Sequence, residues 1–180
     1  MVDVLIKSWL EPEHVERIRE SDPRVRVLYD AALVPPPQGR RRLLYRAESP
    51  RELVSEQELL WDNALTVLAR HFGISFQPTM GIIHQAQPKP TLDRLAEVLA
   101  GENLLVMTAL VSITGLTGSG LLAIGLWNKL FSPDQVWKAA HVDEDYQIAQ
   151  WGQDEEAADR RAKRRVEFDT AVTVLNAFRA

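Results

Sequence analysis

Apolar residues recur at helical spacing over much of the chain after residue 50, and this spacing predicts a series of helices. Residues 50–72 form the first, with Ser49 as its predicted cap, Pro50 at its first position and Gly73 at its end. A second helix is expected over residues 91–100, capped by the threonine at its start. The pattern therefore predicts a mainly α fold.

An uncharged run over residues 103–128 leaves two interpretations open. The run is long enough to span a bilayer as one helix. Its middle reads GLTGSG, however, and such glycines are typical of a break between two helices. We expect two short buried helices, over about residues 103–114 and 119–130, and keep a membrane-anchored helical protein as an alternative.

One helix is predicted from Pro133 to Trp151, because Ser132 and Gln135 form a capping-box pattern at its start and Gly152 follows its end. A last helix is expected over about residues 154–178, acidic in its first turn and basic over residues 160–165. Salt bridges along that helix explain the basic cluster better than a phosphate contact does.

A carboxylate would lie on an apolar stripe of the helix that starts at Pro133. The members of this stripe are Trp137, Ala140, Glu144, Ile148 and Trp151. A carboxylate among apolar groups is costly without a partner, so we expect the stripe to meet another protein. A second stripe of Ala139, Val142, Tyr146 and Ala149 would pack on the core. The alternative is that Glu144 pairs internally with an arginine.

The first part of the chain has a different pattern. Residues 2–8 and 24–29 are typical of strands and residues 12–20 of a helix, which predicts a βαβ-like segment over residues 1–34. The prolines and arginines that follow, at residues 35–41, indicate a linker.

Residues 42–180 are then expected to form a multi-helix domain. Within it, residues 74–85 predict a short β hairpin or two extended pieces.

Composition narrows the function classes. The chain has 180 residues, 46% of them hydrophobic and 26% charged, with a net charge of −4 and no cysteine. The negative charge disfavours nucleic acid as a partner. The missing cysteines exclude disulfides and thiol nucleophiles and suit a reducing compartment. No signal or transit peptide is evident, so we expect a cytoplasmic protein in a bacterium, or a matrix protein if the source is mitochondrial.

The candidate catalytic and metal-binding motifs are weak. GLTGSG lacks the spacing of a dinucleotide or P-loop motif, so we expect no nucleotide cofactor. His141, Glu144 and Asp145 share a helical face, but one histidine among acids is common on a solvated surface. No nucleophile-elbow motif occurs. We therefore expect no metal, no cofactor and no enzymatic activity.

An acidic zone is more distinctive. Residues 142–159 contain seven Asp or Glu residues and no Lys or Arg. A solvated pair of helices would explain the charge pattern. The tryptophans on either side of Glu144 favour a protein-binding surface instead, because large aromatic side chains anchor interfaces.

Four segments of the chain resemble one known family. They read LLYRAESPRELVSEQELLWDNAL, GIIHQAQP, LTGSGLLAIGL and VDEDYQIAQWGQDEEAADRR. Together they resemble the ATP synthase assembly chaperones of mitochondria and alphaproteobacteria, in the branch that handles the alpha subunit of the catalytic head. The resemblance covers about residues 42–180. Residues 1–37 instead resemble the start of a D-isomer-specific 2-hydroxyacid dehydrogenase, where family members normally carry a β-rich domain.

The family resemblance implies a helical chaperone domain that holds the unassembled alpha subunit until its beta partner arrives. It implies no stable membrane insertion. The expected client-binding residues are Trp137, Asp143, Glu144, Gln147, Trp151, Gly152, Asp154, Glu155 and Glu156. The enzyme-class alternative is a remnant of a nicotinamide-dependent 2-hydroxyacid dehydrogenase.

Overall fold

The computed structural model describes residues 2–5, 25–28, 42–80 and 85–179. The chain divides into two compact units, residues 1–40 and 41–180. In the first unit, β1 (Val2–Leu5) pairs in parallel with β2 (Val25–Leu28). The two predicted strands are confirmed, whereas the predicted helix over residues 12–20 and the predicted linker lie outside the described residues.

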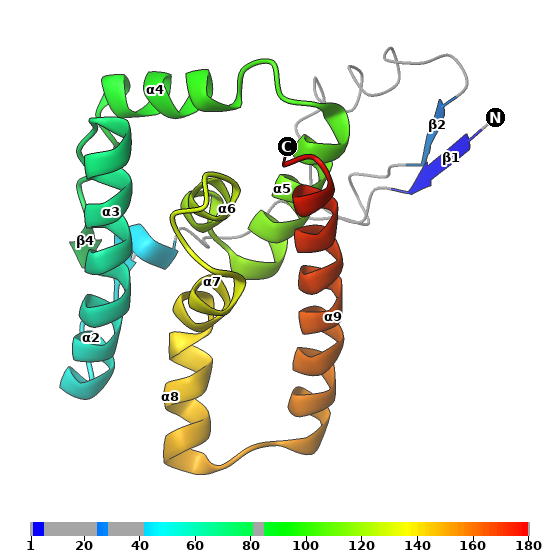
Figure 1. Cartoon of the computed structure of the whole chain (residues 1–180). Coiled ribbons are helices and arrows are strands. Elements are labelled where there is room, and N and C mark those ends of the chain that lie inside the picture. The colour runs from blue at the N-terminus through cyan, green and yellow to red at the C-terminus, as the bar shows by residue number, and fades with distance from the viewer. Residues whose placement is uncertain (1, 6–24, 29–41, 81–84, 180) are drawn as a thin grey trace. The chain divides into compact units, whose positions relative to one another are not determined.

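The second unit is mainly helical, as predicted (Figure 1). It begins with a 3₁₀ turn, η1 (Arg42–Leu44), and the short strand β3 (Tyr45–Arg46). Its remaining elements, in chain order, are α2 (Arg51–Gln57), the π-helical turn η2 (Glu58–Asp62), α3 (Asn63–Phe72), β4 (Thr79–Met80), α4 (Lys89–Leu99), α5 (Leu104–Thr117), α6 (Gly120–Trp127), α7 (Pro133–Ala140), α8 (Val142–Trp151) and α9 (Glu155–Ala177).

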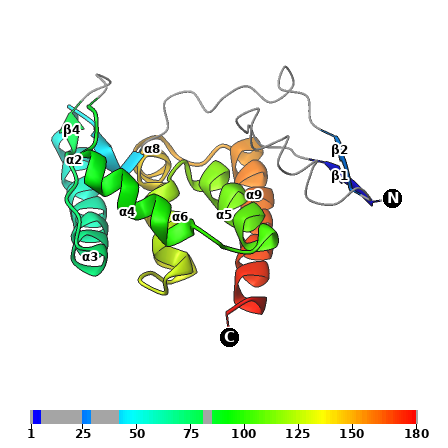
Figure 2. The ribbon, with the colours of Figure 1, turned by 90° about the horizontal axis from the view of Figure 1, so that it is seen from above.

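The uncharged run folds into two buried helices, α5 and α6, at the centre of the core. Gly118, with a φ of +69°, ends α5, and the Ser119 hydroxyl caps α6 by accepting from the Leu122 amide at 3.3 Å. Helix α9 packs along α5, and α7 packs against α6 (Figures 1 and 2). The run thus forms two helices and not the single helix of the alternative. Among the described residues, no helix combines the length and apolar character needed to cross a membrane.

Local end signals are mostly confirmed. The side chains of Ser132 and Gln135 form the expected capping box at the start of α7. Gly73 and Gly152 end α3 and α8 with φ angles of +68° and +83°, which residues other than glycine rarely adopt. Asp154 caps α9.

The expected helix over residues 50–72 is less regular than predicted. The helical segment starts at Arg51 with no side-chain cap, and the wide turn η2 interrupts it. Within η2, the indole of Trp61 is 1% exposed and donates to the Ala139 carbonyl at 2.7 Å. A distant element therefore fixes the position of this ring.

One further prediction is wrong. Helix α4 begins at Lys89 rather than at the predicted cap Thr91, whose hydroxyl donates instead to the Ser75 carbonyl at 2.7 Å. The hairpin expected over residues 74–85 lies partly outside the described residues and stays a prediction. Within its described part, strand β4 pairs in parallel with β3, a strand at the beginning of the helical unit.

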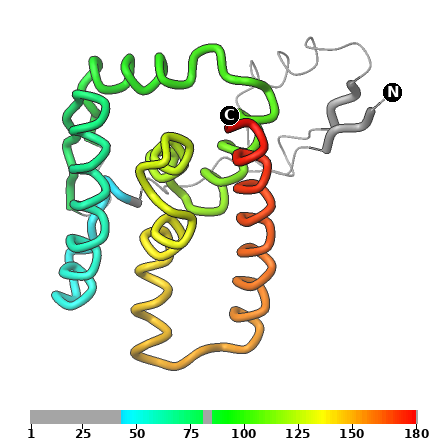
Figure 3. Tube along the Cα trace, in the orientation of Figure 1, coloured from blue at the N-terminus to red at the C-terminus, as the bar shows by residue number. Residues whose placement is uncertain are grey.

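The predicted single helix from Pro133 to Trp151 is broken at His141, where α7 gives way to α8 (Figure 3). His141 has φ −116° and ψ 15°, outside the helical region. The predicted stripe does not form one exposed surface, because its members on α7 are buried, whereas on α8 Glu144 is half-buried and Trp151 is exposed.

Candidate functional site

The two tryptophans of the predicted site lie in opposite environments. Trp137 is 8% exposed, stacks on His141 with ring centroids 4.0 Å apart, and contacts Phe168 at 5.3 Å. Trp151 is 78% exposed at the end of α8. Trp137 therefore belongs to the core, which contradicts its predicted role as an exposed anchor, whereas Trp151 is accessible.

Asp143 makes an internal contact. Its carboxylate accepts from the side-chain amide of Gln57 at 2.7 Å, and the oxygen of that amide accepts from the Ala47 backbone at 2.8 Å. Gln57 is 2% exposed. The Gln57 side chain of α2 thus bonds both to α8 and to the residue that follows β3. Through this bond, Asp143 holds α8 against α2.

Glu144 and Asp145 begin the outer part of α8. Glu144 is half-buried and forms no hydrogen bond or ion pair with another residue that the structure describes. Asp145 pairs with Arg161 of α9 at 2.5 Å. Glu144 is therefore neither sealed in the core nor paired with an arginine across the described residues.

Most of the remaining predicted site residues come together where α8 turns into α9, at the end of both helices away from the α5–α6 core (Figure 1). We call this surface the acidic tip. Its members are Trp151, Gly152, Asp154, Glu155 and Glu156, all exposed. Gln147 is exposed one helical turn before it.

Two acids of the tip also serve α9 locally. The carboxylate of Asp154 accepts from the Ala157 amide at 2.8 Å, and Glu156 pairs with Arg160 at 2.5 Å. Glu155 lies in the first helical turn, where the helix dipole favours a negative charge. The acidic tip thus contains a capped helix start, where exposed carboxylates lie close to the exposed indole of Trp151.

Most arginines of α9 form ion pairs or hydrogen bonds within the helical unit, in agreement with the salt-bridge interpretation. Arg165 pairs with Asp134 of α7 at 2.7 Å and with Asp169 at 3.0 Å, and these carboxylates raise its pKa. Arg164 donates to the Leu116 carbonyl of α5 at 2.5 Å. These contacts direct positive charge inward and leave the tip acidic.

His141 is 1% exposed at the junction of α7 and α8. Its Nδ1–H donates to the Trp137 carbonyl at 2.8 Å, and its Nε2 is buried without a partner among the described residues. Burial lowers the pKa of His141. The hydrogen bond to the Trp137 carbonyl opposes this shift, the charges of Arg164 and Arg161 add to it, and the charge of Glu144 opposes it. Among the described residues, no group of three potential ligands could hold a metal ion.

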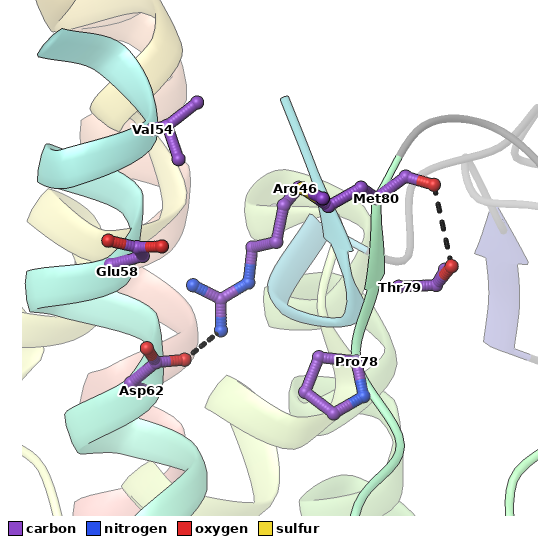
Figure 4. Close-up of a pocket in the computed structure, with 7 residues that line it drawn as sticks. All are labelled: Arg46, Val54, Glu58, Asp62, Pro78, Thr79 and Met80. Atoms are coloured by element: carbon purple, nitrogen blue, oxygen red, sulfur yellow. Dashed lines mark hydrogen bonds and ion pairs between the residues drawn. The ribbon is translucent and has the colours of Figure 1, made fainter. Parts of the chain in front are cut away.

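A pocket on the other side of the unit was not predicted from the sequence (Figure 4). It lies between the α2–η2 helix face and the β3–β4 strands, with a volume of about 560 Å³. Arg46 extends from β3 into this region and pairs with Asp62. A charged residue inside the apolar sequence LLYRA was the signal that could have drawn attention to it.

The fold of the chain is similar to the folds of solved chaperone structures. The chain is similar to Atu1473, a proposed chaperone from Agrobacterium tumefaciens, with 36% identity and a TM-score of 0.71 over 74% of this chain and 50% of that protein. It is also similar to Atp12 from Paracoccus denitrificans, with 29% identity and a TM-score of 0.72 over 78% of this chain and 60% of that protein.

A point mutant of the Paracoccus protein gives a similar match, with 28% identity and a TM-score of 0.71 over 77% of this chain and 59% of that protein. This chain therefore spans between half and three fifths of the length of these proteins. No protein-family model matches it.

Proposed function

We propose that this protein is a non-enzymatic assembly chaperone that binds the unassembled alpha subunit of the F-type ATP synthase. The structural similarity to Atp12 and Atu1473 supports the chaperone class. The family motifs identified in the sequence support the alpha subunit as the client. Those motifs fall within residues 42–180, the part of the chain that forms the helical unit.

The observation that carries the proposal is the exposure of Trp151. An indole that is 78% exposed leaves a large apolar area in water, and the chain has no described element that covers it. Exposed aromatic groups beside charges are typical of protein-binding surfaces, because burying the ring against a partner supplies most of the binding energy. Trp151 would anchor the client.

The carboxylates of the tip would set the orientation of the client. Asp154, Glu155 and Glu156 are exposed, so they can attract Lys or Arg side chains of the client before contact. Such rim charges increase the rate of association more than the final affinity, and salt screens them. We therefore expect the association rate to fall as the salt concentration rises. The affinity that the indole contributes should change little with salt.

The test is co-expression with an alpha subunit, followed by pull-down and a light-scattering assay of alpha-subunit aggregation. Trp151→Ser should weaken client binding roughly 30-fold, since losing an interface anchor costs about 2 kcal/mol. Val166→Ser is the matched control, because Val166 is 67% exposed on α9 away from the tip. Full protection by the folded Trp151→Ser protein would refute the proposal.

Charge is tested in the same assays. Glu155→Lys should slow association at low salt, and Glu167→Lys, an exposed change further along α9, should have little effect. Circular dichroism confirms that each variant is folded. Equal slowing by both substitutions would show that only net charge matters, and would remove the tip from the proposed binding surface.

The dehydrogenase alternative rests on residues 1–37. Of these, the structure describes only β1 and β2, whose parallel pairing is common to many nucleotide-binding folds. Nothing in the described residues favours this alternative over the chaperone proposal, and it stays a prediction from the sequence.

A further inference from the structure

The guanidinium of Arg46 has hydrogen-bonding capacity that the described part of the chain does not use. Arg46 is 7% exposed and pairs with Asp62 through one nitrogen, Nη2. Its Nε and Nη1 are buried and have no acceptor among the described residues. Buried donors without acceptors are costly, so an acceptor that reaches these atoms when the side chains around them move apart would be stabilising.

Trp61 holds the guanidinium in place without satisfying these donors. The guanidinium carbon of Arg46 lies 5.4 Å from the centre of the Trp61 ring. Such a cation–π contact uses the face of the cation, whereas its N–H groups point outward in its plane. Because the Trp61 indole is fixed by the Ala139 carbonyl, the position of Arg46 is set before any ligand binds.

The pocket beside Arg46 is open to solvent and large enough to hold part of a peptide. Its volume of about 560 Å³ lies in the range of ligand-binding pockets. Figure 4 shows Val54, Glu58 and Asp62 from the helix on one side and the β4 segment with Met80 on the other. Met80 is 65% exposed, and methionine adapts its shape to varied apolar partners.

The charges of the pocket select the ligand class. Two carboxylates, Glu58 and Asp62, face one guanidinium, which leaves one net negative charge. This balance disfavours phosphate, nucleic acid and free carboxylates. A neutral carbonyl oxygen can accept from Arg46, and a neighbouring cation can pair with Glu58, which is exposed. An extended polypeptide with basic side chains supplies both groups.

We propose that the Arg46 pocket binds an extended, basic segment of a partner polypeptide, with a main-chain carbonyl bound to Arg46, a Lys or Arg side chain paired with Glu58, and an apolar side chain against Val54 and Met80. Strands β3 and β4 form a two-stranded sheet with no further strand among the described residues. An extended segment can align with such a sheet edge. The site is separate from the acidic tip and does not depend on the client proposed for it.

The test uses a short acetylated and amidated peptide of alternating Lys and Val, with the corresponding Glu and Val peptide as the control. Isothermal titration measures affinity to the whole chain. Nuclear magnetic resonance follows the Arg46 Nε–Hε group and the Met80 methyl group. The Lys–Val peptide should bind and shift both signals, and the Glu–Val peptide should not bind.

Two charge reversals on the same helical segment localise the effect. Glu58→Lys should weaken the Lys–Val peptide about fivefold, because an exposed ion pair becomes a repulsion. Glu56→Lys is the matched control, since Glu56 is exposed but does not line the pocket. The proposal is overturned if the Lys–Val peptide does not bind, if the Arg46 signal does not move, or if both reversals weaken binding equally.

Discussion

Replacing Gln57 by Leu should destabilise the protein, because this buried amide forms a hydrogen bond that connects α2 with α8. Gln57→Leu keeps most of the side-chain volume and removes two hydrogen bonds, one from the Ala47 amide and one to the Asp143 carboxylate. A neutral hydrogen bond contributes about 1 kcal/mol and one to a charged group about 1.5–3 kcal/mol. Asp143 is half-buried, so the lower value applies to it.

The expected loss is therefore about 2–3 kcal/mol in the free energy of unfolding. Urea denaturation followed by circular dichroism measures it, and Gln147→Leu, at an exposed glutamine of α8, is the control. A double-mutant cycle with Asp143→Ala should give a coupling energy of about 1 kcal/mol. If Gln57→Leu is as stable as the Gln147→Leu control, the amide does not connect the two helices as described.

Two further perturbations have defined outcomes. A Cβ at Gly125 would lie 2.2 Å from the Phe131 ring, so Gly125→Ala should destabilise the protein by about 1–3 kcal/mol, whereas Gly115→Ala, with open space around it, should be neutral or stabilising. Equal thermal midpoints for the two variants would contradict this packing. Because burial lowers the pKa of His141, the unfolded chain binds the proton more readily, and stability should fall as the pH drops below the ordinary histidine value of about 6.5. His141→Gln should flatten this dependence in urea titrations across the pH range, and an unchanged slope would show that another group causes it.

The helices that the sequence predicted well have strong local signals. The capping box of Ser132 and Gln135 starts one helix, and Gly73 ends another. These residues act on backbone groups only a few residues away, so the helix ends can be predicted without knowledge of the fold. The corner between α5 and α6 follows the same rule, because Gly118 and Ser119 end one helix and cap the next.

The elements that were missed depend on distant contacts. Strands β3 and β4 are two residues long each and pair across the whole of α2, η2 and α3, so neither has a period that a sequence pattern could reveal. No glycine or proline lies near His141, so the sequence gives no signal of a helix break there. The ring of His141 stacks on Trp137 in the core, and this packing accompanies a non-helical backbone there.

The candidate site was predicted in part for the same reason. The acidity of the α8–α9 turn is a property of composition, and it was evident from the sequence. The Arg46 pocket and the Gln57 contact were not, because both join residues from separate elements.

The local sequence was enough to predict most of the helical segments, most of the helix ends and the acidic turn, because these properties depend on backbone hydrogen bonds and charges within a few residues. Which tryptophan is exposed depends on the tertiary structure. Trp137 and Trp151 lie on the same stripe of the helix predicted from the sequence, but burial depends on what packs from elsewhere in the chain. Phe168 and His141 enclose Trp137, while α8 ends in solvent at Trp151.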